Sequence, residues 1–226
     1  MEQPTSTQRY KCIYFVATLY MAIMACSAIL ANKLIALPFG ILSAASIISP
    51  FWFMLTDIIA EVYGYKMARS LFWSVIVCQF LLAFTCFFII RLNSPDFWHG
   101  QDAYELVTGH LVGIALFALV GSILSWKINT HLLLKWKALL KGRYFWLRSL
   151  GSSIIGEIIF SILSVTFSLI GMFEAKVIFD ILIWSCIFKI IGLIVLSPLS
   201  AYIVYFIKKI EGPIESDYSV NPILNY

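Results

Sequence analysis

Long apolar runs, separated by short polar or basic stretches, make up most of this chain. About 20 apolar residues in a helix are needed to cross a hydrocarbon core of about 30 Å. Six runs meet that requirement, at residues 13–31, 41–60, 71–90, 106–126, 149–172 and 177–207. The pattern therefore predicts an all-α integral membrane protein, a bundle of six transmembrane helices.

Three of these spans have features that bear on where they begin or end. Pro50 interrupts the second span, and Pro198 lies in the sixth, which is longer than one crossing needs. Because proline lacks an amide N–H, we expect Pro198 to kink the sixth helix or to end its spanning part. The first span follows Arg9 and Lys11 as a signal peptide would, but it is long and no small-residue cleavage site follows. We interpret it as an uncleaved span.

The composition supports the membrane assignment. Of the 226 residues, 61% are hydrophobic and 12% are charged, whereas a soluble domain has about 25% charged residues. One soluble core of this size could not bury so much apolar surface. The net charge of +4 is small and scattered, so we expect no direct binding to nucleic acid. The cysteines and histidines lack metal-ligand spacing, so we expect no metal or other cofactor.

Lysine and arginine are concentrated on one side of the predicted spans. With the N-terminus inside, the cytoplasmic segments hold twelve of them, and the outer segments hold only Lys33, Arg91 and Lys176. The positive-inside rule then places both terminal segments, 1–12 and 208–226, in the cytoplasm. Residues 127–143 interleave leucines with bases, which predicts an amphipathic helix lying flat on the inner leaflet.

Some polar residues lie at membrane depth, where ionisable groups are costly unless they are paired or hydrated. At a rise of about 1.5 Å per residue, Glu157 and Lys189 lie near the midplane and Gln79 lies at a similar level. They could form a structural ion pair and an interhelical hydrogen bond, or line a polar pocket. Asn32 and Lys33 end the first span, where Lys33 could also extend to the outer headgroups.

Asp57 and Glu61 end the second span four residues apart, and hence on one face of a helix. Two interpretations are open. They could pair with Lys66 and Arg69 at the cytoplasmic interface, or they could serve a polar pocket inside the bundle. No phosphate-binding loop or nucleophile motif accompanies them, so the sequence favours a transporter over an enzyme.

Two motifs carry a family resemblance. In the first, Asn32-Lys33 and Pro50 precede an Asp-x-x-x-Glu-x-Tyr-Gly motif at residues 57–64, which Arg69 follows. In the second, Tyr144-Phe145-Trp146-Leu147-Arg148 runs into Ser152-Ser153 and Gly156-Glu157. Over most of residues 12–207 the chain resembles the bacterial queuosine precursor transporter family, earlier grouped as putative vitamin uptake transporters. The resemblance implies six helices, similar to the substrate-binding components of energy-coupling-factor transporters.

The implied task is uptake of 7-deazaguanine bases across the bacterial inner membrane, without a dedicated ATPase module. The family usually has a Gln followed three residues later by an Asp in its fifth span, where this chain has Glu157 and Phe160. We expect Glu157 or Glu61 to accept hydrogen bonds from the N1–H and 2-amino groups of the base. The predicted substrate-binding residues are Asn32, Lys33, Asp57, Glu61, Gln79, Glu157 and Lys189.

Within this set, Asn32 and Gln79 would contact the O6 side or the 7-substituent, and Asp57 would contact substrate or act as a protonatable coupling group. The expected partners are thus a deazapurine base and the lipid bilayer. Alternatives are a substrate-binding subunit that needs an energising partner, and an intramembrane enzyme. The small-residue spacing of Ser152 and Gly156 suits packing within one chain and a homo-oligomer equally well.

Overall fold

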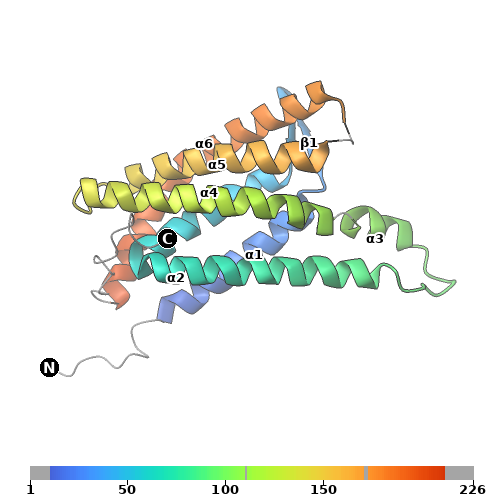
Figure 1. Ribbon diagram of the computed structural model, residues 1–226, viewed down its shortest axis with the longest axis horizontal. Coiled ribbons are helices and arrows are strands. Elements are labelled where there is room, and N and C mark those ends of the chain that lie inside the picture. The colour runs from blue at the N-terminus through green and yellow to red at the C-terminus, as the bar shows by residue number, and fades with distance from the viewer. Residues whose placement is uncertain (1–10, 110, 171–172, 212–226) are drawn as a thin grey trace.

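Helices make up nearly all of the computed structural model, which describes residues 11–109, 111–170 and 173–211. The elements in this part of the chain are α1 (Lys11–Leu30), β1 (Leu34–Leu37), β2 (Gly40–Ser43), α2 (Ala45–Ile89), α3 (Gln101–Thr108), α4 (Leu111–Leu139), α5 (Phe145–Leu169) and α6 (Ala175–Glu211). Five stretches among the described residues are long and apolar enough to cross a membrane. This is therefore a mainly helical, multi-pass membrane protein (Figure 1).

The count of six separate spanning helices differs from the structure at α2. This 45-residue element contains both predicted spans 41–60 and 71–90, joined at Gly64. Gly64 has φ 83° and ψ 173°, a backbone conformation that side chains exclude and glycine permits. In Figure 1 the two halves of α2 run in opposite directions from this bend. One residue thus reverses the chain where the sequence pattern predicts a loop of about ten.

A β-hairpin follows α1 at the end of the bundle opposite the Gly64 bend (Figure 1). Its strands pair antiparallel, with Leu34 opposite Ser43 and Leu37 opposite Gly40. The second span was expected to begin at residue 41, but the chain remains extended to Ser43 and α2 begins at Ala45. We call this the hairpin end of the bundle.

The segment predicted to lie flat on the membrane is instead the continuation of α4. The helix runs without a break from Leu111 to Leu139. Asn129, Leu133 and Lys137 follow one another at intervals of four residues, and all three face the interior: Asn129 and Leu133 are buried, and Lys137 reaches Glu61. This inward stripe keeps the segment within the bundle.

The first half of α2 lies at the centre of the packing. Every residue from 52 to 63 is buried, so this segment needs no amphipathic pattern. Gly192 of α6 lies against Pro50, where a methyl group would come within 2.6 Å of the proline Cγ. α4 packs along α5, and Ser125 Oγ donates to the carbonyl of Gly156 at 2.8 Å. The α6 helix continues through Pro198 rather than ending there.

Candidate functional site

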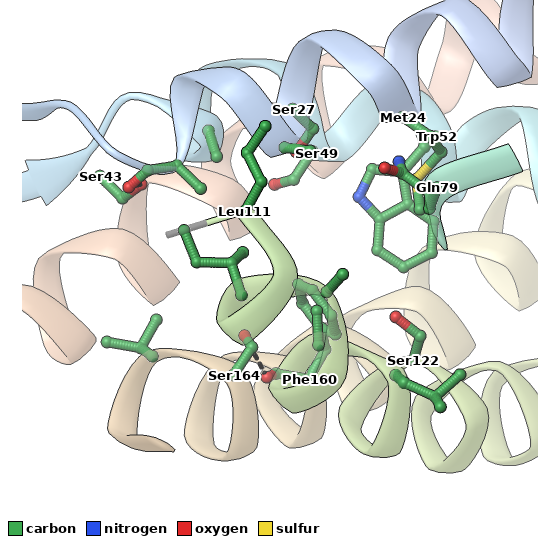
Figure 2. A pocket seen from close by; sticks show the side chains of 18 of the residues that line it. Met24, Ser27, Ser43, Ser49, Trp52, Gln79, Leu111, Ser122, Phe160 and Ser164 are labelled. Carbon is green, nitrogen blue, oxygen red and sulfur yellow. Dashed lines mark hydrogen bonds between the residues drawn. The ribbon is translucent and has the colours of Figure 1, made fainter. Parts of the chain in front are cut away.

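A cavity of about 140 Å³ lies between the helices in the half of the bundle next to the hairpin. Every spanning element contributes to its wall, and β1 and β2 add Leu34 and Ser43 (Figure 2). Most of the lining is apolar. The polar and aromatic side chains of the wall include Ser46, Ser49, Trp52, Gln79, Phe160 and Lys189, together with four further serines. In another protein a cavity of similar volume takes up one aromatic ring.

Aromatic rings form one part of this wall. Trp52 and Phe160 meet edge to face, with ring centroids 5.5 Å apart. The ammonium of Lys189 lies 5.4 Å from the centroid of Phe160, within range of a cation–π contact. Gln79 and Trp52 line the same cavity (Figure 2). The wall thus combines flat apolar surface with an amide and a cation.

Two hydroxyl groups in the cavity wall are buried without a hydrogen-bond partner. Ser46 and Ser49 lie three residues apart on the first turns of α2, so both face the same side. Buried polar groups in folded proteins are nearly always hydrogen-bonded. Hydroxyls left free in a cavity wall are suited to bind a polar solute.

Glu157 and Lys189 form the ion pair that their depths allowed. Lys189 Nζ lies 2.7 Å from Glu157 Oε1, and both groups bond Ser161: Lys189 donates to its Oγ at 2.9 Å, and its Oγ donates to Glu157 Oε1 at 2.9 Å. Glu157 is fully buried, and its Oε2 has no partner. Lys189 lines the cavity and Glu157 does not, so Glu157 lies behind Lys189 as seen from the cavity.

Asp57 lies outside this cavity and is fully hydrogen-bonded. Its Oδ1 accepts from Asn129 Nδ2 at 2.7 Å, and its Oδ2 accepts from Ser149 Oγ at 2.6 Å and Ser153 Oγ at 2.7 Å. The carboxylate is completely buried. These bonds connect the centre of α2 to α4 and α5.

Glu61, one turn further along α2, is surrounded by bases from three other helices. Lys208 Nζ lies 3.0 Å from its Oε1, while Lys137 Nζ and Arg148 Nη1 lie 3.3 and 3.4 Å from its Oε2. These three basic side chains come from α6, α4 and α5. Of the two interpretations that the sequence left open, one was pairing of Asp57 and Glu61 with Lys66 and Arg69 at the interface. We call this end, opposite the hairpin, the basic end.

Arg148 also fixes the linker between α4 and α5. Its guanidinium donates to the carbonyls of Arg143 at 3.0 Å and of Gly142 and Leu133 at 3.4 Å each. The linker turns sharply, and Tyr144 has φ 53°. Arg148, the arginine of the second motif, therefore has a structural role in this linker.

The remaining predicted residues do not line the cavity, although their chain neighbours Ala31 and Leu34 do. Asn32 Nδ2 donates to the carbonyl of Val107 at 3.0 Å, which joins the end of α1 to α3, and Lys33 is exposed. Of the seven predicted residues, the structure brings Gln79 and Lys189 to the cavity and Glu157 directly behind it. Asp57 and Glu61 lie together toward the basic end.

Sequence reasoning missed several partners of the buried acids and both free hydroxyls. Ser149 and Ser153 were available as a signal, because hydroxyls four residues apart mark one face of an apolar helix. Asn129, an amide in a hydrophobic segment, was another. Ser46 and Ser49 carry no such signal, because serines are common near the start of helices.

Comparison with known proteins identifies the family. The family model described as "putative vitamin uptake transporter" matches residues 43–203. The chain is also 23% identical over 158 residues to the queuosine precursor transporter of Escherichia coli (strain K12), a match that covers 68% of this chain and 67% of that protein. No solved structure matches. With most of its length matched by the family model, the chain belongs to the putative vitamin uptake transporter family.

Proposed function

We propose that this protein imports a 7-deazaguanine base, a precursor of queuosine in tRNA, across the bacterial inner membrane. The observation that carries the proposal is the cavity, whose wall brings free hydroxyls, an amide, an ammonium and aromatic rings together inside the helical bundle. A planar heterocycle with polar edges complements such a wall, since its faces stack and its edges hydrogen-bond. The family match and the E. coli relative support this class of substrate.

Each polar group in the wall has a role in the proposal. Gln79 and the hydroxyls of Ser46 and Ser49 accept from the N1–H and 2-amino groups of the base, which are its donors. Lys189 donates to the O6 or 7-substituent side. Glu157 acts through Lys189, because Lys189 lines the cavity and Glu157 does not. This replaces the direct contact to Glu157 that the sequence suggested.

The proposed topology has six crossings, with the two halves of α2 crossing separately. The basic end then faces the cytoplasm together with both termini, in accord with the distribution of lysine and arginine. The hairpin end and the cavity face the outside. The hydrogen bonds of Asp57 and the ion pairs of Glu61 hold the helices together in the cytoplasmic half. A bundle that is closed on this side and has its cavity on the other suits a state that receives solute from outside.

Rescue of queuosine in tRNA tests the function. The host is a bacterium that lacks both its own precursor transporter and de novo synthesis, and 7-cyano-7-deazaguanine, 7-aminomethyl-7-deazaguanine and queuine are supplied separately at limiting concentration. We expect the wild-type chain to restore queuosine with at least one base. The variant Asp96→Asn, which removes a charge from an exposed loop residue that does not line the cavity, should restore it equally.

A Gln79→Leu variant separates transport from expression in the same host. It removes the amide from the cavity wall while preserving the volume of the side chain, so rescue should need roughly tenfold more base at unchanged protein level. No rescue by the wild-type chain, with the protein present in the membrane, would refute the proposed function. Uptake by the purified protein in liposomes would show that no energising partner is needed.

A further inference from the structure

The charge around the cavity is unusual for a site that is proposed to take up bases of different charge. Among the described residues that line the cavity, Lys189 is the only one with a charged side chain. No carboxylate contributes to the wall. The nearest acid, Glu157, lies behind Lys189 and is bound to it at 2.7 Å.

The geometry of Lys189 leaves one hydrogen available to a ligand. An ammonium has three donors. Lys189 Nζ donates to Ser161 Oγ and forms an ion pair with Glu157 Oε1. These two partners do not use all three donors, and Lys189 lines the cavity. Such a donor suits an acceptor atom without a proton, such as a carbonyl oxygen or a nitrile nitrogen.

A solute with an ammonium group would meet the opposite situation. It would approach Lys189 in surroundings of low dielectric constant, where repulsion between like charges is strong. The other buried acids among the described residues offer no compensation. Asp57 is bound by Asn129, Ser149 and Ser153, and Glu61 is bound by three basic side chains. Glu211, at the end of α6, accepts from Cys12 N and Tyr63 Oη and does not line the cavity. Because Glu157 does not line the cavity, a cation there would not contact its unpartnered Oε2.

We propose that Lys189 selects substrate by charge: the cavity takes up neutral bases with an acceptor at the 7-substituent or O6 and excludes bases with an ammonium. This inference rests on the proposed function and names the form of the substrate. Lys189 is the specificity-determining residue, and Glu157 and Ser161 hold its ammonium in place.

Uptake of two bases of similar shape tests the inference. 7-Cyano-7-deazaguanine is neutral, whereas 7-aminomethyl-7-deazaguanine carries an alkylammonium at neutral pH. We expect the wild-type protein in liposomes to prefer the cyano base at least tenfold in initial rate at limiting concentration. Lys189→Met leaves the Glu157 carboxylate uncompensated, so the preference should reverse toward the aminomethyl base. The double variant Lys189→Met with Glu157→Gln removes both charges and should bring the ratio within about threefold of one.

A binding measurement on the wild-type protein keeps the test decisive if a variant fails to fold. The purified protein is heated with each base at equal concentration, and the unfolding temperature should rise with the cyano base and remain unchanged with the aminomethyl base. Equal stabilisation by both, or rates for the two bases within twofold, would overturn charge selection while leaving the proposed function intact. A ratio unchanged in both folded variants would also overturn it. If neither base binds or is transported, the proposed function itself fails.

Discussion

Two buried glutamates in this protein have opposite surroundings. Glu61 at the basic end has both oxygens within 3.4 Å of bases from three helices, and no part of that cluster lines the cavity. Glu157, behind the cavity wall, has one oxygen bound by Lys189 and Ser161 and the other without a partner. Both residues are almost inaccessible, with 3% and 0% of their surface exposed.

The difference distinguishes a cluster that holds helices together from the site that we propose binds substrate. Removing one partner from a buried ion pair leaves an uncompensated charge, so a fully partnered cluster such as that of Glu61 resists change and holds helices together. An incompletely partnered cluster beside a cavity keeps hydrogen-bonding capacity for a ligand. We therefore expect substitutions at the basic end to change stability first, and substitutions around the cavity to change uptake first.

The largest effect is expected at Arg148. Arg148→Met removes a buried guanidinium that contacts Glu61 and three carbonyls of α4 and the linker. The free energy of unfolding should fall by about 3–5 kcal/mol, because several buried polar groups lose their partner. Thermal unfolding of the purified protein in detergent measures this. The exposed Lys135→Met, on α4 near the same end, is the control and should change little. Equal stability of the two variants would contradict a stabilising role for the Glu61 cluster.

The second-largest effect is expected at Gly64, since the bend at this residue places Glu61 at the end of the bundle. Gly64→Ala forces a side chain into a backbone conformation with φ 83°, which should cost about 1–3 kcal/mol of stability. Space is not the cause, because no atom lies within 4 Å of the position that a Cβ would take. Gly113→Ala in α4 has the same free space and no positive φ, so it should be neutral or slightly stabilising. A neutral Gly64→Ala would mean that the bend is not fixed by this residue.

The bend also marks a limit of sequence-based prediction. The hydrophobic pattern predicts the two apolar segments of α2, because their length and composition are local properties. It does not predict that one glycine joins them, since a reversal at a single φ/ψ pair leaves the pattern of the flanking residues unchanged. For residues 127–143 the basic side chains favour a helix on the membrane surface, because lysine and arginine are attracted to anionic lipid headgroups. The four-residue interval of Asn129, Leu133 and Lys137 points inward instead.

The candidate site shows the same limit. Depth along a helix follows from residue count, so contact between Glu157 and Lys189 could be anticipated. The rotation of each helix could not, and rotation decides that Lys189 lines the cavity while Glu157 lies behind it. Free hydroxyls at Ser46 and Ser49 follow from packing alone, which no local pattern encodes.

Asp57→Asn and Glu157→Gln compare the two regions directly, as each removes a charge with little change of shape. Asp57 accepts three hydrogen bonds, which are stronger to a carboxylate than to an amide, so stability should fall by about 1–2 kcal/mol. Glu157→Gln weakens the hold on Lys189 and should raise the apparent KM of uptake about tenfold. Unfolding temperature and initial uptake rates are measured for both. A larger rise in KM for Asp57→Asn than for Glu157→Gln would reverse the assignment and favour Asp57 as a substrate or coupling group.

The smallest effect is expected at Ser49, and it is the most selective test of the cavity. Its hydroxyl is buried without a partner, so Ser49→Ala removes no bond from the protein and should leave the unfolding temperature unchanged or slightly higher. Uptake should nevertheless weaken, because one hydrogen bond to the base is worth about 0.5–1.5 kcal/mol, or roughly two- to tenfold in apparent KM. Ser74→Ala is the matched control, since the Ser74 hydroxyl is exposed and bonds its own helix. A fall in stability for Ser49→Ala would reveal a protein partner for the hydroxyl, and an unchanged KM would remove Ser49 from the binding site. Only a loss of uptake without a loss of stability distinguishes a hydroxyl kept for the ligand from one kept for the fold.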